Sequence, residues 1–319
     1  MTDLFFPTPD NPLPDNATAG FLTAHDGRKI RYARFAPASR PDNGTVVLLQ
    51  GRNECIEKYF ETITDLSAKG FGVATFDWRG QGGSDRLLRN PQRGYVKSFR
   101  DYASDLEQFF EEVVLPDCRG PYYILAHSTG ALVALLTASS MVNRVQRMVL
   151  LTPFLGIPGQ RVSMARIRLV TTILSLFGLG RLYAAWGPRP KQSAPFETNN
   201  LTSDAARYRR NTSIYEAHPQ LALGGPTIRW LRAASSAAIA VSDQEFMANI
   251  RIPTLIIAAG ADTVVSTKAV ASYARHLRLS SLLTIDGARH ELLQEADLYR
   301  EQTLAAFHAF IPGTDGSAS

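Results

Sequence analysis

The chain has 319 residues, of which 45% are hydrophobic, and its 34 basic and 29 acidic residues give a formal net charge of +5. This length can bury a large core, and it suits one α/β domain with an insertion or two domains. The small charge excess is typical of a solvated surface, and no basic block interleaved with aromatic residues indicates nucleic-acid binding.

The chain contains few residues that would bind a metal or form disulfides. Cys55 and Cys118 are too few for a disulfide framework, and no cysteine–histidine cluster has metal-ligand spacing, so we expect no metal and no cofactor. The start of the chain lacks the pattern of a signal peptide, and the longest apolar stretch, residues 169–179, is shorter than the ~20 residues that span a bilayer. We therefore expect a soluble cytoplasmic protein. Peripheral contact with the inner membrane face and the oligomeric state stay open.

Predicted strands and helices alternate along the first half of the chain. An irregular arm, residues 1–18, precedes a hairpin around a turn at Gly27. Continuous apolar runs, typical of strands buried on both faces, follow at residues 45–49, 72–76 and 147–151. Helical patterns lie between these runs, at residues 56–68 and 98–114. This alternation predicts an α/β fold with a mostly parallel central sheet flanked by helices.

The alternation breaks at Phe154 and resumes at residue 252. The segment between them contains no convincing buried strand, and it includes an apolar helical stretch at residues 167–186. The later elements are predicted at residues 252–259, 266–277, 281–285 and 297–310. The predicted units are therefore a core of residues 19–154 and 246–312, a helical cap of residues 155–245, and a disordered tail of residues 313–319.

A serine lies where a predicted strand turns into a helix. The strand-forming run that begins at Tyr122 reaches Ser128, and a helical pattern follows Gly130. Small residues stand two positions before and after the serine, Ala126 and Gly130, because larger side chains in so tight a turn would strike the neighbouring strand or helix. This pattern indicates a nucleophile elbow, G-x-S-x-G, with alanine in place of the first glycine. An ordinary strand-to-helix turn is the alternative.

A nucleophilic serine needs a general base, in most enzymes a histidine oriented by a carboxylate. Of the six histidines, His290 alone follows the last predicted strand, and Asp262 follows the strand before it. Ligand sites in open α/β sheets lie at the carboxyl ends of strands, so we expect both residues beside Ser128. The alternatives are a surface histidine and a turn or capping aspartate. His127 is expected to point away from the serine and to have a structural role.

Acyl transfer also requires two donors for the oxyanion of the tetrahedral intermediate. The backbone N–H of Thr129, directly after the serine, is the first candidate. The backbone N–H of Arg52, in the loop after the strand at residues 45–49, is the second. An ordinary loop at residues 50–54 is the alternative interpretation.

Three segments resemble the α/β-hydrolase family, and within it the monoacylglycerol lipase and lysophospholipase L2 branch. They correspond to the branch's H-G-x-G-E loop, its D-x-R-G-x-G-x-S loop and its G-H-S-x-G elbow, at residues 50–54, 77–84 and 126–130. Gln50 replaces the loop histidine and Ala126 replaces the elbow glycine, whereas Asp262 and His290 match the acid and base of the branch. The arginine in the first loop leans toward lysophospholipase L2.

The resemblance implies an α/β-hydrolase fold and hydrolysis of a fatty-acyl ester of a glycerolipid, either an acylglycerol or a lysophospholipid. The acyl-enzyme would form on Ser128. The apolar stretch of the insertion, with Arg166 and Arg168 beside it, is expected either to cover an acyl tunnel and meet a lipid surface or to pack the cap onto the sheet. A short-chain carboxylesterase or an acyltransferase on the same triad is the alternative function, and a non-catalytic receptor on this fold is disfavoured.

Overall fold

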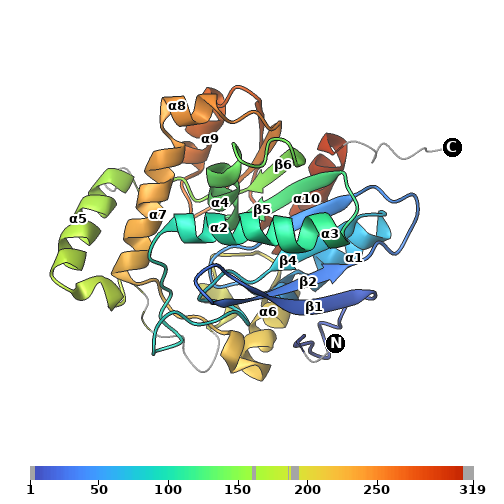
Figure 1. Ribbon diagram of the computed structural model, residues 1–319, viewed down its shortest axis with the longest axis horizontal. Coiled ribbons are helices and arrows are strands. Elements are labelled where there is room, and N and C mark those ends of the chain that lie inside the picture. Colours follow the sequence, from blue (N-terminus) through green and yellow to red (C-terminus); the bar gives the residue numbers. More distant parts are fainter. Residues whose placement is uncertain (1–3, 160–162, 186, 188–193, 312–319) are drawn as a thin grey trace.

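The computed structural model describes residues 4–159, 163–185, 187 and 194–311. The predicted disordered tail, residues 313–319, and the first three residues of the predicted arm lie outside this part. Within it, a mostly parallel sheet of eight strands has the order β1-β2-β4-β3-β5-β6-β7-β8, with helices on both faces (Figure 1). The predicted α/β architecture is confirmed.

The eight strands form one sheet, and the predicted hairpin is its β1–β2 end. They are β1 (Ala17–Thr23), β2 (Lys29–Phe35), β3 (Thr45–Leu49), β4 (Gly72–Phe76), β5 (Tyr122–His127), β6 (Val145–Leu151), β7 (Thr254–Ala259) and β8 (Ser280–Ile285). β2 pairs antiparallel with β1 and β4, and the remaining pairings are parallel. Because successive side chains of a strand face opposite sides, Val46 of β3 joins one hydrophobic cluster and Val47 joins the other.

Helices of the core cover both faces of the sheet. They are η1 (Ile56–Tyr59), α1 (Phe60–Ala68), α2 (Phe99–Phe109), η2 (Phe110–Val114), α3 (Leu115–Asp117), α4 (Thr129–Thr137), α9 (Thr267–His276), η6 (Leu292–Gln294) and α10 (Asp297–Phe310). Phe60 of α1 and Phe307 of α10 pack on one face, and Phe109 of α2 and Leu132 of α4 pack on the other. Since both faces of the sheet are covered by apolar side chains, a polar site is expected at the carboxyl ends of the strands.

The segment between β6 and β7 is largely helical. Its helices are α5 (Met164–Leu176), η3 (Leu179–Arg181), η4 (Phe196–Thr198), α6 (Ala205–Ala217), η5 (Pro219–Leu221), α7 (Ile228–Val241) and α8 (Gln244–Ala248). The prediction of one helical stretch at residues 167–186 is wrong, because Gly178 follows α5 with a φ of 80°, the left-handed conformation that ends helices. In the described part of the chain, no helix is both long and apolar enough to cross a membrane.

A buried ion network ties the N-terminal arm to the loops that follow β3 and β4. Arg31 of β2 donates to Glu57 at 2.8 Å, to Asp77 at 2.7 Å and to the carbonyl of Leu4 at 2.9 Å, and its side chain is 1% exposed. Asp77 also accepts a hydrogen bond from Gln50 Nε2 at 3.1 Å. Because Asp77 follows β4 and Gln50 follows β3, the network holds two loops at the carboxyl edge of the sheet.

Replacing Arg31 by glutamine would leave Glu57 and Asp77 buried without a compensating charge. We therefore expect the free energy of unfolding to fall by about 3–5 kcal/mol, measured by urea denaturation. Arg34→Gln on the same strand is the control, because its partly exposed ion pair with Asp117 should contribute less than about 1 kcal/mol. Equal losses in the two variants would contradict the role of the buried network.

Candidate active site

Ser128 occupies a strained turn between β5 and α4. Its φ of 52° and ψ of −109° form a backbone conformation that costs a non-glycine residue about 1–3 kcal/mol. Hydrogen bonds hold it there: the amide of Ser128 donates to the carbonyl of Leu151 at 2.9 Å, and the carbonyl of Ser128 accepts from the amide of Phe154 at 3.1 Å. The turn places the hydroxyl at the carboxyl edge of the sheet.

Gly130 lets the loop after β3 pack against this turn. A Cβ atom at Gly130 would lie 2.6 Å from the carbonyl oxygens of Leu49 and Gln50, which is closer than real side chains approach. A larger residue would therefore displace the loop. Ala126, which stands where the family pattern has glycine, is fully buried in the core, so the turn accommodates its methyl group.

The structure brings Ser128, His290 and Asp262 together in one chain of hydrogen bonds. Nε2 of His290 lies 3.1 Å from Oγ of Ser128, and Nδ1 of His290 lies 2.7 Å from Oδ2 of Asp262. Asp262 follows β7 and His290 follows β8, as the sequence predicts. All three side chains are largely shielded from water, with Ser128 6% and His290 4% exposed.

Asp262 determines which nitrogen of His290 carries the proton. Burial raises the pKa of the Asp262 carboxyl, but hydrogen bonds from His290 and from the amides of Val264 and Val265 outweigh burial and hold the pKa below its ordinary value. The ionised carboxylate accepts a hydrogen bond from Nδ1–H, so Nε2 is free to accept the Ser128 proton. The arrangement can activate the serine as a nucleophile.

The two predicted oxyanion donors lie on the elbow itself and on the loop that packs against it. Thr129 is the first residue of α4, and the first amides of a helix have no acceptor within the helix. The loop that carries Arg52 lies against the elbow, since a Cβ atom at Gly51 would be 2.8 Å from Nδ1 of His127. Among the hydrogen bonds of the described loops and turns, neither amide is a donor. Both amides can therefore donate to a developing oxyanion.

The sequence analysis did not identify a buried charged cluster beneath this loop. Glu54 accepts hydrogen bonds from the amide of Gly51, from the Tyr59 hydroxyl at 2.6 Å and from Lys58 Nζ at 2.8 Å. Lys58 also pairs with Glu291 at 2.6 Å. Burial raises the pKa of Glu54, but the neighbouring cations outweigh burial and hold it well below its ordinary value. The sequence did contain a signal for this cluster, since the polar residues Glu54, Lys58 and Tyr59 lie just before and at the start of the helix predicted at residues 56–68.

His127 connects this cluster to the backbone of His290. Nδ1 of His127 lies 3.3 Å from Oε2 of Glu54, and Nε2 lies 3.3 Å from the carbonyl oxygen of His290. Because both partners are acceptors, the ring satisfies both only as an imidazolium that donates from each nitrogen. Burial lowers the pKa of His127, but the attraction of Glu54 outweighs burial, so the pKa of His127 in the folded protein lies above its ordinary value of 6.5. His127 thus holds the His290 loop in place.

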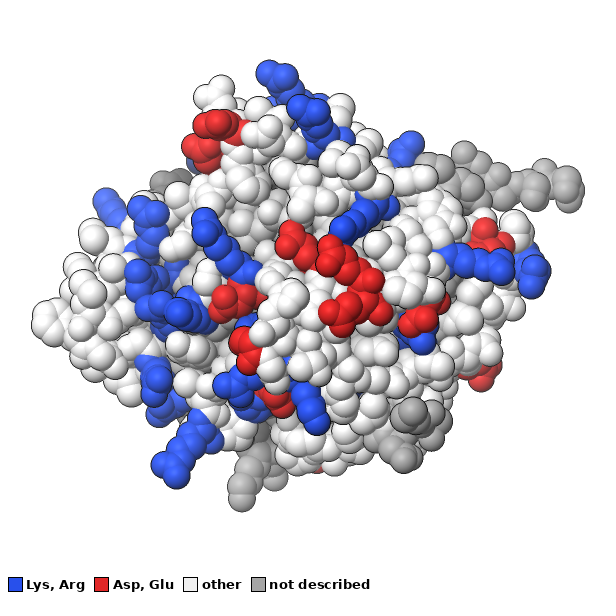
Figure 2. Space-filling model, viewed as in Figure 1, with Lys and Arg blue, Asp and Glu red and all other residues white. Residues whose placement is uncertain are grey.

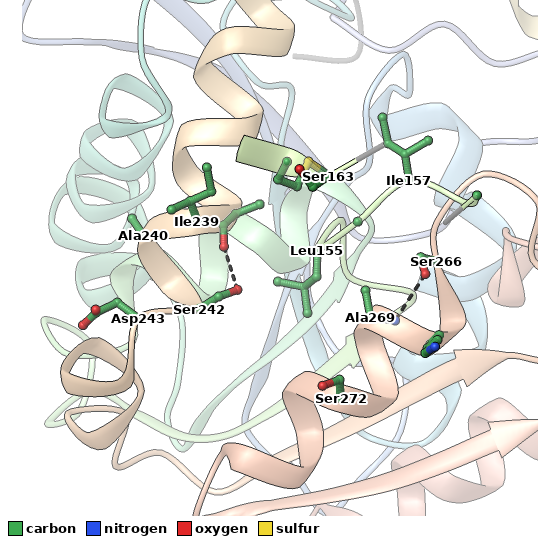
Figure 3. A pocket seen from close by; sticks show the side chains of 15 residues that line it. Leu155, Ile157, Ser163, Ile239, Ala240, Ser242, Asp243, Ser266, Ala269 and Ser272 are labelled. Atoms are coloured by element: carbon green, nitrogen blue, oxygen red, sulfur yellow. Dashed lines mark hydrogen bonds between the residues drawn. The ribbon is translucent and has the colours of Figure 1, made fainter. Parts of the chain in front are cut away.

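An apolar pocket of about 760 Å³ lies between the loop after β6, the end of α7 and the start of α9 (Figure 3). Leu155, Ile239 and Ala269 converge on it in Figure 3. Leu155 is next to Phe154, whose amide binds the carbonyl of Ser128, so the chain links one wall of the pocket to the elbow, although no member of the triad lines the pocket. Its size and lining suit a hydrocarbon chain.

The chain is similar to known proteins along most of its length. The model of a family described as serine aminopeptidase S33 matches residues 40–297. Lysophospholipase L2 of Escherichia coli strain K12 is 32% identical, covering 91% of this chain and 85% of that protein. A probable lysophospholipase L2 of Haemophilus influenzae is 29% identical over 91% of both chains. The crystal structure of a soluble variant of Saccharomyces cerevisiae monoglyceride lipase superposes with a TM-score of 0.74 at 19% identity, covering 97% of this chain and 99% of that one.

The charge on His127 predicts a pH-dependent stability. Folding raises the pKa of His127 above its value of about 6.5 in the unfolded chain. The imidazolium therefore stabilises the folded protein fully at pH values below 6.5, and this stabilisation is lost as the pH rises through the pKa of the folded state. We expect His127→Gln to lower the free energy of unfolding by about 1–3 kcal/mol at pH 6, with a deficit that shrinks at higher pH. Urea denaturation across pH measures this. His25→Gln, in an exposed turn, is the control; a deficit independent of pH would argue against the imidazolium.

Proposed function

The chain belongs to the serine aminopeptidase S33 family of α/β-hydrolases and is a carboxylic ester hydrolase, so we propose that Ser128, His290 and Asp262 are its catalytic triad. The observation that carries the proposal is the chain of hydrogen bonds from hydroxyl to imidazole to carboxylate, at 3.1 and 2.7 Å. The proposed substrates are fatty-acyl esters of glycerolipids, either acylglycerols or lysophospholipids. The relatives named lysophospholipase L2 support this class.

In the proposed mechanism, Oγ of Ser128 attacks the acyl carbonyl while Nε2 of His290 takes the hydroxyl proton. The amides of Thr129 and Arg52 stabilise the oxyanion, and ionised Asp262 stabilises the imidazolium without taking a proton. His290 then gives its proton to the departing alcohol, which leaves an acyl-enzyme on Ser128. Water attacks this ester with His290 as base, and His290 returns the proton to Oγ of Ser128 as the free fatty acid is released.

The apolar pocket at the loop after β6 supports the proposal that the substrate has a long acyl chain. Its lining includes Leu155, Ile157 and Met164, which would offer hydrocarbon contacts to an acyl chain that extends from Ser128 past Leu155. A short-chain carboxylesterase or an acyltransferase would use the same triad. Turnover of esters of increasing chain length distinguishes these functions, since a preference for short chains or for an alcohol acceptor would favour the alternative.

We further propose that α5 contacts the lipid aggregate from which the substrate comes. Large apolar side chains are exposed on and just after α5, at Leu169, Val170, Ile173, Leu176, Phe177 and Leu179. In Figure 2 the outer edge of α5 is uncharged, and lysine and arginine gather beside it over α7. An exposed apolar patch bordered by basic residues is typical of a surface that enters a membrane with anionic lipid.

Ser128→Ala tests the proposed nucleophile. We expect fluorophosphonate labelling to disappear and ester turnover to fall by a factor on the order of 10⁴ or more, because no other group can form the acyl-enzyme. Ser139→Ala, at an exposed position after α4, is the matched control and should retain both activities. Turnover retained by the Ser128 variant would refute the assignment.

A double variant, Leu176→Asp with Phe177→Asp, tests the lipid contact. These side chains are 79% and 78% exposed, so the changes should leave the fold intact. We expect binding to vesicles of phosphatidylethanolamine and phosphatidylglycerol to fall at least about tenfold, because two large apolar groups no longer leave water. Turnover of a soluble short-chain ester should be unchanged. Leu298→Asp on α10, 68% exposed, is the control; equal vesicle binding by both variants would contradict the proposal.

A further inference from the structure

The side chain of Arg52 lies between the loop after β3, residues 50–54, and the insertion between β6 and β7. Its Nη1 donates to the carbonyl of Gly224 at 2.9 Å, and its guanidinium carbon lies 5.7 Å from the ring centre of Trp230. Gly94 leaves room for it, since a Cβ atom there would be 2.9 Å from the same Nη1. Arg52 thus contacts the core loop at residue 94 and the insertion at residues 224 and 230.

Arg52 carries a charge that no carboxylate compensates within the described residues. The buried arginines Arg31, Arg79 and Arg300 each pair with an aspartate or glutamate, whereas no ion pair among the described residues includes Arg52. Burial lowers the pKa of the Arg52 guanidinium to about 10, and Tyr102 offsets this only in part, so the group stays charged at neutral pH. An uncompensated charge is costly inside a protein, and such exceptions concentrate at functional sites.

Two aromatic rings connect the guanidinium of Arg52 to the elbow. The ring of Trp230 packs on the ring of Phe154 at 6.0 Å, and the amide of Phe154 binds the carbonyl of Ser128 at 3.1 Å. The backbone amide of Arg52 is itself a proposed oxyanion donor. The carbonyl of Gly224 occupies one N–H group, while Arg52 as a whole residue is partly exposed and its remaining guanidinium nitrogens are not fully shut off from solvent. These N–H groups are therefore open to a ligand between the loop after β3 and the insertion.

A phosphate is the ligand that this arrangement fits. A guanidinium binds a phosphate through two parallel charge-assisted hydrogen bonds. In a lysophospholipid only the glycerol carbons separate the phosphate from the ester, whereas a monoacylglycerol has a neutral hydroxyl at that position. We propose that Arg52 binds the phosphate of a lysophospholipid substrate and so sets the head-group preference, an inference that rests on the proposed ester hydrolysis.

Arg52→Gln and Arg52→Lys test this, with kcat/KM measured on a lysophospholipid and a monoacylglycerol of the same acyl chain. The glutamine variant should lower the ratio of activity on the lysophospholipid to activity on the monoacylglycerol by about ten- to a hundredfold. The lysine variant should fall between, because a point charge cannot form the paired hydrogen bonds. The backbone amide at residue 52 is kept in both variants.

Arg93→Gln is the matched control, because Arg93 also donates to an insertion carbonyl and lies over an aromatic ring, that of Tyr183. It should leave the ratio of the two activities unchanged. Equal loss on both substrates in Arg52→Gln, or no loss on either, would reduce Arg52 to a tether for Gly224 and overturn the inference. If the unaltered enzyme cleaves neither lipid, the proposed function fails instead, so the two failures are distinguishable.

Discussion

The backbone of Ser128 is the constraint on which the rest of the site depends. A serine with a φ of 52° persists only where its surroundings over-determine it, and here the carbonyl of Leu151 on β6 and the amide of Phe154 do so. Gly130 extends the constraint, because its missing side chain lets the carbonyl of Gln50 approach α4. One turn therefore positions the loop after β3, the serine and the entrance to the insertion relative to one another.

Two buried carboxylates convert that constraint into a rigid site. Asp77 accepts a hydrogen bond from Nε2 of Gln50, which explains how glutamine can stand where the family pattern has histidine. Glu54 holds the other end of the same loop, and His127 links Glu54 to the carbonyl of His290. The loop after β3 and the loop of the proposed base therefore share one charged cluster, so loss of the His127 proton would loosen both.

Local sequence patterns could locate the candidate site residues that directly follow strand-forming runs. Ser128, Asp262 and His290 could be selected because the carboxyl ends of parallel strands meet at one edge of the sheet. The side-chain contacts of Arg52 and His127 could not, since their partners Gly224 and His290 are 172 and 163 residues away. Local patterns were also insufficient in the insertion. Apolar periodicity indicated a helix there, but it did not indicate that the helix would end before Gly178.

Arg52 would serve two purposes through different atoms. An oxyanion forms on every ester, so an amide donor at this residue acts on all substrates alike, whereas the guanidinium would distinguish only those with an anionic head group. The chemistry then stays in the core, and recognition depends on how the insertion sits against it, through Gly224 and Trp230. Because replacing a side chain leaves the backbone amide in place, such an arrangement allows head-group preference to change while the reaction at Ser128 is retained.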